Sequence, residues 1–117
     1  MKKLLAITLL FFTLVSLALP RPALAADIAK GAEIFSNKCA VCHQNGGNTI
    51  NPQKTLSKAH LEIFAKDSGT DLTAAIIAQV TNGKGMMTAF GKTGQLKPEQ
   101  IEDVAAYVVA QSEKNWK

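Results

Sequence analysis

Both cysteines of the 117-residue chain lie in residues 37–45, "NKCAVCHQN", three positions apart and with a histidine directly after the second. Three chemistries use this spacing: a redox dithiol, part of a metal site, and covalent attachment of a haem. Two thiols about one helical turn apart can each add to a vinyl group of one porphyrin. The histidine that follows would then lie under the ring, where its imidazole can bind iron.

The other two chemistries lack the residues or the context they need. A structural zinc site requires four ligands, and the only other histidine is His60. A thioredoxin-like dithiol belongs to a βαβ context, and the chain shows no strand-like alternation. A Cys39–Cys42 disulfide would close too small a loop to stabilise the fold much. We therefore predict one covalent haem c on Cys39 and Cys42, with His43 as an iron ligand.

A second iron ligand is expected in the loop "NGKGMMTAFG", residues 82–91. The loop holds Met86 and Met87, and a thioether with a histidine is the high-potential axial pair of electron-transfer haems. Two methionines between glycines are poor core material, so we predict that one of them binds iron. His60 is the rival ligand, but its helical position turns it towards solvent, as expected for an ordinary surface histidine.

Residues 1–25 have the pattern of a cleaved secretory leader. Lys2 and Lys3 precede an apolar run that ends at Pro20, and small residues stand at the cleavage site after Ala25. The run is shorter than the roughly 20 residues of a membrane-spanning helix. We expect a working domain of residues 26–117, without a membrane span.

Removal of the leader changes the interpretation of charge. The formal net charge of +4 falls to about +1 once Lys2, Lys3 and Arg21 are lost, and no arginine remains. Aromatic residues make up only 6% of the chain. These features argue against binding of nucleic acid, which uses clustered cations and stacking aromatics.

The remaining residues predict an all-α domain of about four helices. The first starts near the N-cap Asp27 and runs into the cysteine motif. The second follows Ser57 and ends near Ala65, and the third spans about 71–81 before a left-handed cap at "NG". The last opens at Pro98 and shows apolar residues at helical spacing.

The chain resembles the cytochrome c6 family over nearly the whole of residues 26–117. The resemblance rests on "AKGAEIFSNKCAVCHQNGGN", "KTLSKAHLE", "QVTNGK", "AFG" and "VAAYVVAQSEKNW". It implies a class I cytochrome c fold around one haem, with Met87 rather than Met86 as the sixth ligand. It also implies that Gln79 lies beside the haem, and that the first and last helices cross at Gly31, Phe35 and Tyr107.

The resemblance further implies a function and a compartment. Members carry electrons from the cytochrome b6f complex, through its cytochrome f, to photosystem I in the thylakoid lumen. A c6-like paralogue, or a donor to a terminal oxidase in a luminal or periplasmic chain, is the alternative. No enzyme activity is expected, because a sixth ligand closes the iron site and no distal His/Arg pair is visible.

The chain departs from the family pattern after the ligand methionine. Thr88 stands where the family usually has proline, which would stiffen the loop. Lys92 is the only cation near the position where many members carry an arginine used in docking. We therefore expect a looser bond between Met87 and iron, and either weaker docking to photosystem I or a different main partner.

Overall fold

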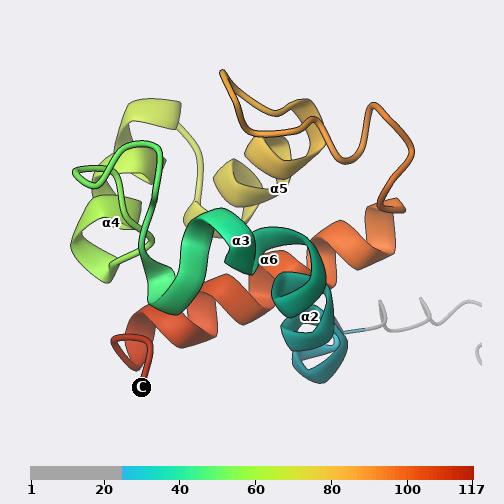
Figure 1. Ribbon diagram of the computed structural model, residues 1–117, viewed down its shortest axis with the longest axis horizontal. Helices are drawn as coiled ribbons and strands as arrows, with labels where there is room; N and C mark the ends of the chain where they lie inside the picture. Colours follow the sequence, from blue (N-terminus) through green and yellow to red (C-terminus); the bar gives the residue numbers. More distant parts are fainter. Residues whose placement is uncertain (1–24) are drawn as a thin grey trace, which may run out of the picture.

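The computed structural model describes residues 25–117, which form helices joined by loops (Figure 1). The predicted leader, residues 1–25, lies outside this part of the chain except for Ala25. The elements are α2 (Ile28–Ile34), the π-helix η1 (Phe35–Cys39), α3 (Ala40–His43), the 3₁₀ turn η2 (Gln44–Gly46), α4 (Lys58–Ser68), α5 (Leu72–Asn82) and α6 (Pro98–Glu113). Residues 25–117 contain no β-strand, so the predicted all-α class is confirmed.

The helix α6 is the element against which the others are arranged. Figure 1 shows it running from orange to red across the molecule, with the α2–α3 run crossing in front of it. The helices α2, α5 and α4 all contact α6, and α4 also contacts α5. This arrangement encloses one apolar core, whose buried members are Phe35, Leu61, Ile76, Val80, Phe90, Leu96, Ile101, Val104, Ala105 and Val108.

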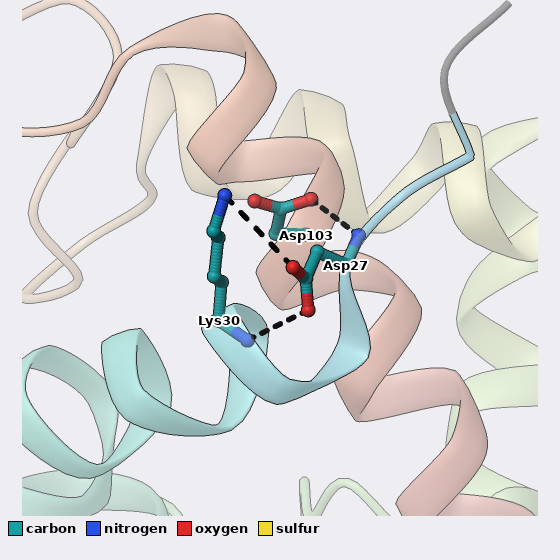
Figure 2. Close-up of polar contacts among 3 residues, drawn as sticks. All are labelled: Asp27, Lys30 and Asp103. Carbon is teal, nitrogen blue, oxygen red and sulfur yellow. Dashed lines mark hydrogen bonds and ion pairs between the residues drawn. The ribbon is translucent and has the colours of Figure 1, made fainter.

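The start of α2 is fixed by two carboxylates (Figure 2). The Asp27 side chain accepts a hydrogen bond from the Lys30 backbone N–H at 3.1 Å, which confirms the predicted N-cap. The Asp27 backbone N–H donates to the Asp103 carboxylate at 2.7 Å. Because Asp103 belongs to α6, this bond holds the first turn of α2 on the last helix.

Four residues further on, α2 crosses α6 at Gly31. A Cβ atom here would collide with the backbone carbonyl of Asp103 and would lie 2.9 Å from Cβ of Tyr107. One turn later the Phe35 and Tyr107 rings pack with centroids 5.3 Å apart. The predicted crossing of the first and last helices at these residues is confirmed, and it requires a residue without a side chain.

The predicted starts of the other helices are also confirmed. Ser57 and Asp71 accept hydrogen bonds from the backbone N–H groups of the residues three positions on, and so cap α4 and α5. Pro98 occupies the first turn of α6, and the Gln100 side chain accepts from the Lys97 N–H at 2.9 Å.

The structure corrects three local expectations. First, α4 continues to Ser68 and ends at Gly69 in the left-handed conformation, three residues beyond the predicted end. Second, Gly83 after α5 has a positive φ of 63° but an extended ψ of 175°, so it is not the left-handed cap that "NG" suggested. Third, the first helix widens into the π-helix at Phe35, and no local sequence rule predicts this change.

Within residues 25–117, no helix combines the length and the apolar character needed to cross a membrane.

We predict that Gly31→Ala destabilises the protein despite the higher helix propensity of alanine. Propensity alone would stabilise the helix by about 1 kcal/mol, whereas overpacking of a close contact costs about 1–3 kcal/mol. The free energy of unfolding of the haem-loaded protein, measured in guanidinium chloride, should therefore fall. An unchanged or higher value would show that α2 and α6 can move apart freely at this point.

Candidate functional site

The cysteine motif lies at the transition from η1 to α3. Cys39 is the last residue of η1, and Cys42 and His43 end α3. Both cysteines are free thiols, half-buried, and Cys39 packs against the apolar core. The helical run therefore holds the two thiols at a spacing of three residues, as the sequence analysis expected.

The environment of Cys39 disfavours thiolate chemistry. Burial raises the pKa of this thiol from 9.0 to about 11. A thiolate is the form that attacks a disulfide, so burial that opposes this charge disfavours a reactive dithiol. A thioether carries no charge and is compatible with the same surroundings. Among the described residues, no group of three or more His, Cys, Asp or Glu side chains could hold a metal ion.

His43 has one ring nitrogen committed and one free to bind iron. Its Nδ1 lies 2.9 Å from the carbonyl oxygen of Gly47. A carbonyl oxygen can only accept, so Nδ1 carries the proton and Nε2 keeps its lone pair. This is the arrangement that orients metal-binding histidines and raises their basicity. No sequence pattern predicts this contact, because only the fold brings the Gly47 carbonyl to the ring.

Met86 and Met87 have different environments. The backbone groups of Lys84 and Met87 exchange two hydrogen bonds, of 3.0 and 3.2 Å, which close a two-residue hairpin turn. Gly85 has a φ of 59° at the first central position, as a type II′ turn requires. Met86 is the second central residue and is 79% exposed.

The Met87 side chain instead faces the interior and contacts Gln79. It is half-buried and packs against the core cluster. Its sulfur accepts a hydrogen bond from Nε2 of Gln79, a residue of α5, over 3.7 Å. The structure thus brings together two of the residues that the resemblance singled out, Gln79 and Met87. Within the described residues no hydrogen bond joins them to the cysteine motif, but Cys39 and Met87 border the same core.

The loop that carries Met87 returns across the end of α5. A Cβ atom at Gly83 would lie 2.7 Å from the Ala89 nitrogen. The Lys92 backbone N–H then donates to the carbonyl of Thr81 at 3.1 Å. Residues 83–92 are therefore held against the helix that supplies Gln79.

His60 is not the solvent-facing residue that the helix pattern predicted. It is half-buried, and its Nδ1 lies 2.7 Å from Oγ1 of Thr55 and 3.2 Å from the Thr55 backbone nitrogen. The backbone N–H can only donate, so Nδ1 acts as acceptor and the proton of the neutral ring is on Nε2. In this tautomer His60 has no free lone pair for iron, and the residue fastens the loop before α4.

The residues present fit a covalently bound haem. Two cysteine thiols three residues apart, an imidazole with a free Nε2 and the half-buried thioether of Met87 are the groups that such a haem uses. Core residues from α5 and α6 supply the apolar surroundings that a porphyrin requires.

Comparison with known proteins points to the same chemistry. The sequence model of the family described as "Cytochrome C oxidase, cbb3-type, subunit III" matches residues 26–108. A cytochrome c6 from Nostoc sp. is 53% identical over 117 residues, which covers the whole of both chains.

Two solved structures extend the likeness to the fold. Cytochrome c6 from the diatom Phaeodactylum tricornutum is 45% identical, has a TM-score of 0.71, and matches 78% of this chain and 100% of its own. Reduced cytochrome 6A from Arabidopsis thaliana is 36% identical, with a TM-score of 0.66 over 78% of this chain and 98% of its own. The predicted class I cytochrome c fold is confirmed by this similarity.

The contrast between the two methionines gives a prediction. In the haem-loaded ferric protein, Met87→Ala should abolish the charge-transfer band between sulfur and iron. It should also lower the reduction potential by a sizeable part of the roughly 0.8 V that axial ligands span. Met86→Ala is the matched control. The band and the reduction potential should be unchanged in this variant, because the Met86 side chain is exposed at the turn. Loss of the band in Met86→Ala alone would reverse the assignment.

Proposed function

The chain belongs to the cytochrome c6 family, a family of electron carriers with one covalently bound haem c, and we propose that it transfers electrons from the cytochrome b6f complex to photosystem I. The proposal is supported above all by the 53% identity to a cytochrome c6 over the full length of both chains. Membership of the family makes the chain an electron carrier, and the two named complexes are what we propose.

We infer the ligand set from the contacts described above. Cys39 and Cys42 would hold the haem through thioethers, and Nε2 of His43 and the sulfur of Met87 would bind the iron. The haem, when bound, supplies a one-electron couple between ferrous and ferric iron. The fixed hydrogen bond from His43 to Gly47 keeps the imidazole in one orientation, which limits rearrangement when charge changes.

Gln79 would act on the potential through Met87. Its amide N–H donates to the sulfur, at 3.7 Å, and so withdraws electron density from this ligand. The apolar core excludes water from the same region and favours the less charged ferrous state. Both effects raise the reduction potential, as a donor to photosystem I requires. We propose no enzyme activity, because these residues would fill both axial positions.

Docking to the two complexes would be transient and sensitive to salt. A carrier must leave each partner quickly, so the contact area is small and charge steers the encounter. We place the carrier in the thylakoid lumen after removal of residues 1–25, with a periplasmic location as the alternative.

Two other routes have specific support. The 36% identity to Arabidopsis cytochrome 6A and the presence of Thr88 after the ligand methionine favour a c6-like paralogue as the second candidate. The family model described as an oxidase subunit makes donation to a terminal oxidase a third route.

The first test is the reduction potential of the haem-loaded protein, followed by flash-induced electron donation to photosystem I particles over a range of salt concentrations. We expect a high positive potential and donation whose rate changes with ionic strength. A clearly lower potential, or donation to a terminal oxidase but not to photosystem I, would contradict the proposed route.

Replacement of Thr88 by proline should make the Met87 side of the haem more rigid. Thr88 is exposed, and its backbone N–H donates no hydrogen bond within residues 25–117. Proline at a compatible position typically stabilises the folded conformation by about 0.4–1 kcal/mol, because it lowers the entropy of the unfolded chain. This energy corresponds to a roughly two- to fivefold change in an equilibrium constant. We expect external imidazole to displace Met87 more slowly by this factor in Thr88→Pro. Thr88→Ala serves as the control, and equal rates in both variants would show that the loop is already rigid.

A further inference from the structure

The C-terminal end of α6 turns the chain back towards the cysteine motif. The Trp116 N–H donates to the carbonyl of Gln111 at 2.9 Å, and the Asn115 N–H donates to that of Ser112 at 3.2 Å. Asn115 has a φ of 54°. These two bonds around a left-handed residue form a Schellman motif, which ends the helix and reverses its direction. Figure 1 shows the C-terminus in red beneath the loop that follows α3.

This turn places the Trp116 indole in an aromatic cluster. Its ring lies 5.1 Å from that of Phe35 and 6.1 Å from that of Tyr107, measured between centroids. Phe35 is the first residue of η1, the π-helix that ends at Cys39. The indole therefore contacts the segment that leads into the cysteine motif.

The same indole contacts the segment that leaves the motif. A Cβ atom at Gly46 would collide with the ring, so the backbone here passes directly against it. The indole N–H donates to the Leu56 carbonyl at 2.8 Å, and the Leu56 N–H donates to the Gly46 carbonyl at 2.7 Å. Trp116 thus holds Gly46 both by contact and through Leu56.

Gly46 directly precedes Gly47, the partner of His43. The carbonyl of Gly47 accepts the hydrogen bond of 2.9 Å from Nδ1 of the imidazole. Any displacement of Gly46 moves this carbonyl with it. Trp116 itself has a φ of 58°, a conformation that bulky residues rarely adopt, so its contacts must compensate for the strain.

We propose that Trp116 is a positioning residue for the axial histidine, holding residues 35–47 at both ends so that the Gly47 carbonyl stays on Nδ1 of His43. The proposal rests on the proposed function only in taking His43 as an iron ligand. It concerns the strength of the ligand's hydrogen bond and not the identity of the redox partners.

The decisive variant is Trp116→Phe in the haem-loaded protein. Phenylalanine keeps an aromatic ring in the cluster but cannot donate to the Leu56 carbonyl. We expect the Nδ1 proton of His43, followed by NMR in the diamagnetic ferrous state, to exchange with solvent about five- to tenfold faster, as loss of one hydrogen bond permits. The reduction potential should also rise, because a less basic imidazole stabilises ferric iron less.

Two further variants separate positioning from general stability. Trp116→Ala removes the contact with Gly46 as well as the hydrogen bond, so exchange should accelerate more than in Trp116→Phe. Gly69→Ala places a side chain at an exposed left-handed residue, with a φ of 70°, at the end of α4. It should lower stability without changing the exchange of the His43 proton or the potential.

Exchange rates and potentials in Trp116→Phe that match those of Gly69→Ala would overturn the proposal and leave Trp116 a core residue only. A parent protein in which His43 does not bind iron would overturn both this proposal and the proposed ligand set. Failure to reduce photosystem I would affect only the proposed route, because none of these readouts requires a partner.

Discussion

The close crossing of α2 and α6 at Gly31 is the contact on which the rest of the molecule depends. It brings the backbone of the first helix onto the carbonyl of Asp103, and the bond from Asp27 to the same residue fixes the first turn. With the start of α2 fixed, the direction of the helical run is set, and so is the point where it reaches the cysteine motif. A side chain at the crossing would displace that whole run, because protein interiors are close-packed.

The sequence predicted much of the fold because helix starts are local. Asp27, Ser57 and Asp71 cap the helices that follow them, and each bond spans only three residues. Pro98 is equally informative, since its fixed φ suits a first turn. The features that were missed need partners far away in the chain. The π-helix, the half-buried position of His60 and the turn at Trp116 all depend on which segments the fold brings together.

The candidate site also combines features that follow from neighbouring residues with features that depend on the fold. Residue types and spacing singled out the two thiols and His43, because the chemistry proposed for them is determined within five residues. Spacing could not distinguish Met86 from Met87, and family resemblance had to supply the choice. The hairpin turn gives the two methionines different environments, since the positive φ of Gly85 leaves Met86 at the exposed tip and directs Met87 towards Gln79. Gly47 was not predictable, because a backbone carbonyl carries no sequence signal.

The two sides of the candidate haem site are held in different ways. His43 ends a continuous helical run, and aromatic contacts and hydrogen bonds hold the residues on either side of the motif. Met87 lies at the end of a two-residue turn, and the only side chain that bonds its sulfur within residues 25–117 is Gln79, over 3.7 Å. The short loop that carries Met87, held by one weak hydrogen bond, therefore moves more easily than the helical run that carries His43, which is held at both ends. With Met87 as the proposed iron ligand, small changes of sequence on the methionine side would alter the reduction potential most readily, and Thr88 lies on that side.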